Sequence, residues 1–167
     1  MISDNLQLFE VHFKPKSPSK YPPIIFVPGW GSFIDSWKIV LKEMTKFFEI
    51  FYIETREKSS AEHSPEQSIS IEEIGSDLAR IVKIKDLEKS KFIVLGSSMG
   101  ATAIIDSMIN SSLKPSLSVL IGPNLEYRIP KIWIFIIKLL PASLYKLIKP
   151  MAKLYMKKKY IDMNSDP

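Results

Sequence analysis

The stretch that decides the fold is Phe92-Ile93-Val94-Leu95-Gly96-Ser97-Ser98-Met99-Gly100-Ala101. Its four leading apolar residues predict a strand that is buried on both faces of a parallel sheet. A serine follows with glycines two positions before and two positions after it, and a helix is expected from Ala101 onward. A serine on so tight a strand-to-helix turn adopts a strained backbone, and the small residues relieve the crowding around it. This context predicts that Ser98 projects from the carboxyl end of the sheet as a nucleophile.

Backbone N–H groups beside this serine are the expected oxyanion donors. The helix behind Ser98 should begin with free N–H groups and the positive end of its dipole, and both favour an oxyanion. A second stretch, Val27-Pro28-Gly29-Trp30-Gly31, directly follows another apolar run, and its glycines let the backbone approach a ligand closely. The donors are therefore expected to be the N–H groups of Met99 and Trp30. The plainer alternative for both stretches is a small-residue turn that serves packing alone.

The remainder of the chain alternates short apolar runs with segments of helical periodicity. The expected strands, in addition to 92–95, are 6–13, 23–27, 50–53 and 117–121. The expected helices are 37–48 with Asp35 as N-cap, 71–82 opened by a capping box of Ser70 and Glu73, and 101–109. Strands that alternate with helices predict an α/β fold, a parallel sheet with helices on both faces. The polar stretch 54–68 predicts a long loop.

The alternation stops after residue 122, and 131–159 has helical periodicity broken at two prolines. We therefore expect a core over 1–125 and a helical cap or lid segment over 126–167. The strand at 117–121 would then be apolar and uncovered, which favours self-association through the sheet edge. A sheet that ends there is expected to be a truncated fold, with the natural protein continuing beyond Pro167.

Charge is concentrated at one end of the chain. The net charge of +5 combines about +6 over 131–167 with about −1 over 1–130. Basic residues among apolar ones at one end are not the pattern of a nucleic-acid-binding surface. The segment 131–159 has two interpretations: a cap that lines an acyl pocket over the nucleophile, or an amphipathic helix that makes peripheral membrane contact. Three lysines disfavour a spanning helix over 129–148.

The composition of the chain limits its class of protein, the kinds of site it can hold and its location. The chain of 167 residues is 46% hydrophobic and 25% charged, as in globular domains. It has no cysteine, which excludes disulfides, cysteine-based zinc sites and thiol nucleophiles. The first residues lack a basic and apolar leader, so a cytoplasmic location is expected.

Pro28-Gly29-Trp30-Gly31 and Gly96-Ser97-Ser98-Met99-Gly100 occur in the order found in one family. Over about residues 6–125 the chain resembles the N-terminal, nucleophile half of α/β-hydrolases of the esterase, lipase and haloperoxidase-like group. The resemblance implies hydrolysis of a small-molecule ester or related acyl compound, without cofactor or metal ion: Ser98 attacks a carbonyl, a histidine takes its proton and an acid holds that histidine. The family's Asp-x-Arg-Gly-x-Gly-x-Ser loop corresponds to the stretch that begins Glu54–Ser60, which keeps Arg56 and, one position early, Ser60, but neither glycine.

The base is missing from its usual place. The family order puts the acid and the histidine after the nucleophile, whereas no histidine follows His63. His63 is one candidate for a replacement base, although a solvated loop residue is the plainer interpretation; His12 is expected to be structural, and Asp77 and Asp106 to be surface charges on helices. Two functions remain: a serine hydrolase that is incomplete in this chain, and a non-catalytic degenerate hydrolase that binds a lipid, acyl ligand or membrane surface.

Overall fold

The computed structural model describes residues 6–64, 66–124 and 150. The chain divides into two units, Met1–Leu125 and Glu126–Pro167, and the fold below is that of the first. The expected cap or lid segment, and with it the candidate membrane-contacting stretch 131–159, lies outside the described residues except for Pro150. None of the helices in the described part of the chain is long and apolar enough to cross a membrane.

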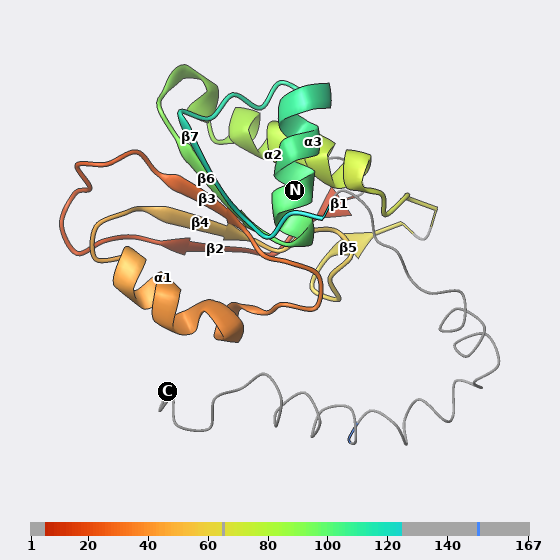
Figure 1. Cartoon of the computed structure of the whole chain (residues 1–167), viewed down its shortest axis with the longest axis horizontal. Coiled ribbons are helices and arrows are strands. Elements are labelled where there is room, and N and C mark those ends of the chain that lie inside the picture. Colours follow the sequence, from red (N-terminus) through yellow and green to blue (C-terminus); the bar gives the residue numbers. More distant parts are fainter. Residues whose placement is uncertain (1–5, 65, 125–149, 151–167) are drawn as a thin grey trace. The chain divides into compact units, whose positions relative to one another are not determined.

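A five-stranded sheet forms the centre of the first unit, with the strand order β2-β4-β3-β6-β7 (Figure 1). Its strands are β2 Glu10–Phe13, β3 Ile24–Val27, β4 Ile50–Ile53, β6 Ile93–Ser97 and β7 Leu117–Ile121. β4, β3, β6 and β7 run parallel to one another, and β2 runs antiparallel to β4. The parallel sheet predicted from the sequence is thus confirmed, and it carries in addition one antiparallel strand at its edge.

Two short strands lie outside this sheet and depart from the prediction. β1 (Leu6–Gln7) pairs antiparallel with β5 (Glu62–His63). The single strand expected over 6–13 is therefore two strands, because its first residues pair with β5 and its last residues pair with β4. The stretch 54–68, expected to be a loop, contains β5.

Helices cover both faces of the sheet, as predicted (Figure 1). The 3₁₀ turn η1 and helix α1 lie on one face, and α2 and α3 lie on the other; their bounds are η1 Ile34–Trp37, α1 Lys38–Met44, α2 Ile71–Ile84 and α3 Met99–Asn110, with the 3₁₀ turn η2 at Leu87–Lys89. Alternating side chains of β3 supply both cores. Ile24 and Phe26 cluster with Leu41 of α1, whereas Ile25 and Val27 cluster with the buried residues of α2 and α3.

The two predicted helix caps had different outcomes. Ser70 is the N-cap of α2, and its hydroxyl accepts a hydrogen bond from the Glu73 N–H at 3.3 Å, so that prediction is confirmed. The prediction of Asp35 as a cap is wrong. Asp35 lies inside η1, because the chain enters α1 through a 3₁₀ turn whose N-cap position is held by Phe33.

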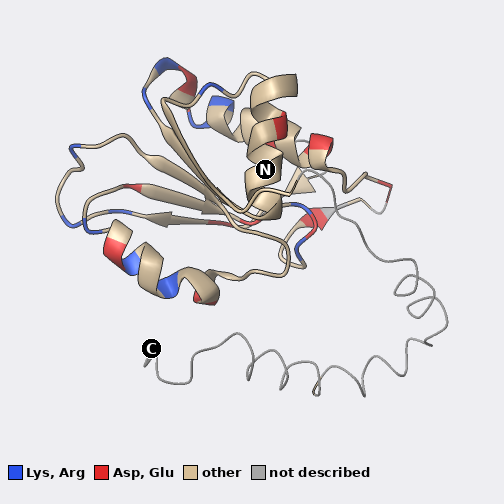
Figure 2. Cartoon of the chain, in the orientation of Figure 1, with Lys and Arg blue, Asp and Glu red and all other residues tan. Residues whose placement is uncertain are grey.

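The parallel strands of the sheet are uncharged, but they differ in their exposure to solvent. β3, β4, β6 and β7 contain no charged residue, and the charges gather on helices and loops (Figure 2). β7 is nevertheless exposed: Leu117, Val119 and Ile121 are 55%, 39% and 46% exposed. Within the described residues, the last strand is therefore apolar and uncovered, as the sequence predicted.

Candidate active site

Ser98 forms the turn between β6 and α3. Its φ of 50° and ψ of −119° lie in a region that residues with a side chain rarely adopt. The Ser98 N–H donates to the Ile121 carbonyl at 2.8 Å, and its own carbonyl accepts from the Thr102 N–H at 3.1 Å. The side chain makes no capping hydrogen bond to α3. Hydrogen bonds with β7 and α3 therefore fix the backbone of Ser98, whereas its hydroxyl does not cap the helix.

Two glycines allow this turn to pack. A Cβ added to Gly96 would lie 2.6 Å from Ile104 Cδ1 and 2.7 Å from the Ala101 Cα. A Cβ added to Gly100 would collide with the Val27 carbonyl oxygen and would lie 2.6 Å from that of Pro28. Both positions therefore exclude any side chain, because β6, α3 and the end of β3 approach one another at backbone distance.

The stretch after β3 forms a tight turn beside the serine. The Ser32 N–H donates to the Gly29 carbonyl at 3.2 Å, and Gly31 has a φ of +70°, as the third position of a type II turn requires. Trp30 stands at the second position with its side chain 76% exposed. A Cβ on Gly29 would lie 3.0 Å from Ser98 Cβ. The turn that carries the Trp30 N–H therefore lies directly against Ser98.

Met99 is the first residue of α3. The first four N–H groups of a helix have no acceptor within that helix. Ser98 occupies the N-cap position, and its side chain accepts no hydrogen bond from these N–H groups. The backbone donor of Met99 is thus available next to the serine hydroxyl. The structure brings together the five residues proposed from the sequence: Ser98, Trp30, Met99, Gly96 and Gly100.

The stretch after β4 is buried, which the sequence did not predict. Its buried polar residues are Glu54, Thr55, Arg56 and Lys58, each no more than 6% exposed. The Arg56 Nε and Nη2 donate to the two carboxylate oxygens of Asp77 at 2.8 and 2.7 Å, and Nη1 donates to the Ser68 carbonyl at 2.7 Å. The hydrogen bond with Asp77 is the main cause that raises the pKa of Arg56 above its ordinary value.

Asp77 is therefore not the surface charge that its place in a predicted helix suggested. It is 1% exposed and lies on the buried side of α2, where Arg56 compensates its charge. The prediction was wrong because the partner is 21 residues away in the sequence and belongs to a different element. Asp106 is half-buried, and its Oδ1 accepts from Asn110 at 2.7 Å.

Lys58 is the site residue that sequence reasoning missed. Its ammonium donates to the carbonyls of Gly29 and Ser32, at 2.7 and 2.8 Å, and so it binds the turn that carries Trp30. One signal was present in the sequence. Lys58 follows β4, and the carboxyl ends of parallel strands meet at one edge of the sheet, where the turns after β3 and β6 also lie.

Neither histidine is placed beside Ser98 by a described contact. His12 lies on β2, where its Nε2 is 2.7 Å from Glu49 Oε1 and its ring stacks on Phe51, in keeping with the structural role expected for it. His63 pairs with Leu6 in the two-stranded sheet. Over residues 6–64 and 66–124, no three His, Asp or Glu side chains gather closely enough to hold a metal ion.

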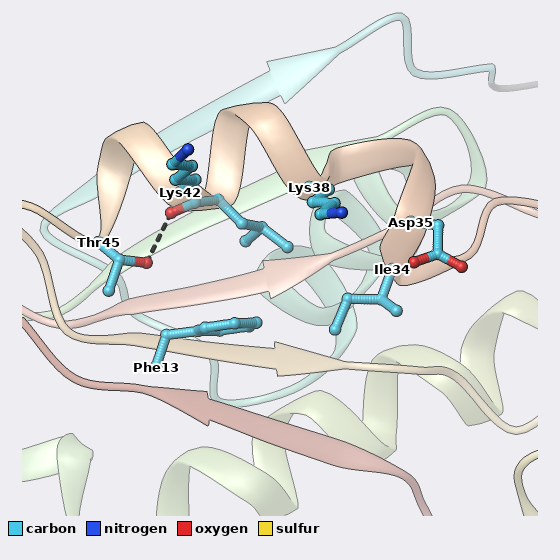
Figure 3. A pocket seen from close by; sticks show the side chains of 7 residues that line it. Phe13, Ile34, Asp35, Lys38, Lys42 and Thr45 are labelled. Carbon is cyan, nitrogen blue, oxygen red and sulfur yellow. Dashed lines mark hydrogen bonds between the residues drawn. The ribbon is translucent and has the colours of Figure 1, made fainter. Parts of the chain in front are cut away.

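A surface hollow of about 490 Å³ lies beside α1, away from these residues. Figure 3 shows Phe13 of β2 and Ile34 of η1 lining it, with Lys38 and Lys42 on the helix above. Phe13 pairs with Ile50, the first residue of β4, so this wall belongs to the amino end of the parallel strands. None of the residues around Ser98 lines this hollow.

Comparison with known proteins shows similarity in structure. No protein-family model matches the chain, and no curated protein matches its sequence. An esterase from Thermogutta terrifontis matches with a TM-score of 0.60 and 18% identity over 75% of this chain and 44% of the esterase. An α/β hydrolase fold protein from Burkholderia ambifaria matches with a TM-score of 0.69 and 12% identity, over 89% of this chain and 54% of that protein. A bacterial membrane phospholipase A matches with a TM-score of 0.63 and 14% identity, over 81% of this chain and 43% of the phospholipase.

The chain therefore has the α/β-hydrolase fold. The resemblance expected from the two glycine-containing motifs is confirmed at the level of the fold, and at these identities the likeness establishes the fold alone. The chain spans about half the length of the solved structures it matches.

Proposed function

We propose that this chain carries the nucleophile and the oxyanion hole of a serine hydrolase that cleaves carboxylic esters or related acyl compounds. The observation that supports this most is the backbone of Ser98, which has a φ of 50° at a strand-to-helix turn and is packed against Gly29. Strain of this kind costs on the order of 1–3 kcal/mol and persists where surrounding structure enforces it. A turn that served packing alone would not need a serine at its strained position.

The chemistry follows from the arrangement of the donors. The Ser98 Oγ attacks the acyl carbonyl, its proton passes to a base, and the negative oxygen of the tetrahedral intermediate accepts hydrogen bonds from the Trp30 and Met99 N–H groups. Collapse of the intermediate breaks the acyl–oxygen bond, the leaving alcohol takes the proton back from the base, and an acyl-serine remains. Water, deprotonated by the same base, then attacks the acyl-serine and releases the acid and the free Ser98 hydroxyl. Because His12 contacts Glu49 and no histidine follows Ser98 in this sequence, we assign the base and its acid to additional polypeptide, with His63 as the alternative base.

The proposed substrate class is a small molecule. The structures similar to this chain include an esterase, a deformylase and a phospholipase, and all three names denote hydrolysis of an acyl group. A small acyl compound therefore fits this chain better than a nucleic acid or a protein substrate.

Covalent labelling tests the nucleophile directly. The protein, in the form that its gene encodes, is treated with a fluorophosphonate probe, and the labelled peptide is identified by mass spectrometry. The expected label is on Ser98. Ser98→Ala should lose it, whereas Ser97→Ala should keep it, since Ser97 is the last residue of β6. A label that survives in Ser98→Ala contradicts the proposal.

A non-catalytic degenerate hydrolase is the second candidate, and two observations favour it: His12 contacts Glu49 on β2, and no histidine follows Ser98 in this sequence. In this case the protein binds a lipid, an acyl ligand or a membrane surface through the basic segment 131–159. Sedimentation with anionic vesicles distinguishes the two. Binding that is unchanged in Ser98→Ala, with no ester turnover or probe labelling in either protein, supports the binding function and contradicts the hydrolase.

The intact mass of the natural gene product bears on both candidates. A mass well above 19.1 kDa places the search for the acid and the base in the additional sequence. A mass of 19.1 kDa leaves Ser98 without the histidine that the family places after the nucleophile and favours the binding function.

A further inference from the structure

Lys58 is a buried cation whose hydrogen bonds are concentrated on one turn. Its side chain is 4% exposed, which is rare for lysine unless the charge is paired. Nζ donates to the Gly29 and Ser32 carbonyls at 2.7 and 2.8 Å. The Glu57 carboxylate lies 3.8 Å away, and the ring centroid of Phe33 lies 5.7 Å away. The ammonium therefore joins the loop after β4 to both ends of the Gly29–Ser32 turn.

The geometry of the peptide bond transmits this contact to the proposed oxyanion hole. The Gly29 carbonyl and the Trp30 N–H belong to the same peptide unit, which is planar and trans. In such a unit the C=O and the N–H point in opposite directions. A cation that fixes the direction of the Gly29 oxygen therefore also fixes the direction of the Trp30 N–H.

We infer that Lys58 is a positioning residue that holds the Trp30 N–H in the orientation of an oxyanion donor. The inference rests on the proposed function, because it assigns Lys58 to the same oxyanion hole. Lys58 stands between Glu57 and Ser59, the positions of the two family glycines, and its long side chain crosses from the stretch after β4 to the turn after β3.

The neighbouring charges indicate that orientation is the main contribution. Burial lowers the pKa of the Lys58 ammonium below its ordinary value, and the Glu57 and Glu54 carboxylates oppose this shift. Because Glu57 lies within 4 Å of Nζ, the net charge presented to a distant oxyanion is small. The two hydrogen bonds are short and specific, and donation to the Gly29 carbonyl also polarises its amide, which strengthens the Trp30 N–H as a donor.

The experiment measures how fast Ser98 is labelled by the fluorophosphonate probe in the full gene product. Lys58→Met keeps the length of the side chain and removes the donors. Complete loss of one oxyanion donor typically costs about 10²–10³-fold in rate, and misorientation should cost less, about 10- to 100-fold. The loss should fall on the maximal labelling rate and not on the probe concentration for half-maximal labelling. Lys85→Met is the matched control, because Lys85 is a partly buried lysine that pairs with Glu10 outside the site.

Chemical rescue separates positioning from a general loss of structure. These 167 residues contain no cysteine, so in a gene product whose further cysteines, if present, are replaced by serine, Lys58→Cys can be alkylated at one position with bromoethylamine while unfolded. Refolding then restores an ammonium at nearly the original length. Alkylation should recover most of the labelling rate, even where Lys58→Met does not fold.

The outcomes of this experiment separate the two proposals. A Lys58→Met protein that labels at the wild-type rate overturns the role of Lys58 and leaves the hydrolase standing. An alkylated Lys58→Cys protein that refolds but labels as slowly as its unalkylated form also overturns it. A wild-type protein that does not label at Ser98 overturns the proposed function, and with it this inference.

Discussion

Substitution of Gly100 by alanine tests how closely α3 packs against the end of β3 at the Ser98 turn. The added methyl group would collide with the Val27 carbonyl oxygen, and would lie 2.6 Å from the Pro28 oxygen and 2.9 Å from the Val27 carbonyl carbon. All three atoms are backbone atoms at the end of β3, so no side-chain rotation can relieve the contact. Either α3 or the Pro28–Gly29 segment must shift.

The expected magnitude combines two opposing effects. Replacement of a helical glycine by alanine ordinarily stabilises a helix by about 1 kcal/mol, and by less in the first turn, where Gly100 lies. Overpacking of a filled site costs about 1–3 kcal/mol, and the upper end applies because only backbone can yield. We expect Gly100→Ala to lower the free energy of unfolding by about 2 kcal/mol. Labelling of Ser98 should slow as well, since a displacement of about 1 Å in an active site can cost roughly 10²-fold.

Denaturant unfolding monitored by tryptophan fluorescence measures the stability, because Trp37 packs edge-on against Phe26 in the core. Gly75→Ala is the matched control in α2. There the new Cβ would meet the Asp106 carboxylate oxygen at 2.6 Å and the Ser107 nitrogen at 3.1 Å. The carboxylate can rotate away, and the Ser107 nitrogen and the Ala103 oxygen at 3.2 Å need to move by only a few tenths of an ångström. Gly75→Ala should therefore cost less than Gly100→Ala, about 1 kcal/mol or below. A Gly100→Ala protein that is as stable as the wild type and labels at the same rate would refute the packing described here.

Two further substitutions test the buried polar groups. Asp77→Asn should lower the free energy of unfolding by about 3 kcal/mol, the lower end for a broken buried ion pair, because only the half-exposed Glu73 carboxylate, 3.3 Å from Arg56 Nη1, then remains beside the buried guanidinium. The double variant Arg56→Met with Asp77→Leu should recover most of that loss; urea titration of the three proteins checks this, and equal losses in both variants would contradict it. Tyr52→Phe should raise stability by about 1 kcal/mol, because the Tyr52 hydroxyl is buried without a hydrogen-bond partner among the described residues. Burial, followed by the Glu54 carboxylate, raises the pKa of Tyr52 above its ordinary value. The unfolded chain loses the phenolic proton near pH 10, whereas the folded chain retains it. The wild type should therefore lose stability relative to Tyr52→Phe as the pH rises above about 10. A difference in melting temperature between the two proteins that is the same at pH 8 and pH 11 would argue against this.

Local patterns in the sequence predicted most of the architecture. The apolar runs at 50–53 and 117–121 coincide with β4 and β7, and the Ser70 cap marks the start of α2. These features are local: a buried strand needs a short apolar run, and a cap needs an oxygen at the right spacing. The strand-to-helix turn at Ser98 was predictable for the same reason, since its glycines and its flanking elements are contiguous in the chain.

Interactions between distant segments were not predictable in this way. The polar stretch that follows β4 has the composition of a solvated loop, and yet Arg56 and Lys58 are buried in it. Their partners, Asp77 and the Gly29–Ser32 turn, lie 21 or more residues away in the sequence. A sequence pattern reports the average preference of a side chain for water, whereas burial of a charge depends on whether a compensating group arrives beside it.

The sequence by itself thus determined the alternation of the main strands and helices along the chain, the turn that presents Ser98 and the exposed apolar strand β7. Only the tertiary structure decided which charges are buried and which lysine holds the Trp30 turn. The physical reason is that periodicity and capping act within a few residues, whereas ion pairs and donor orientation require segments that meet only when the sheet has formed.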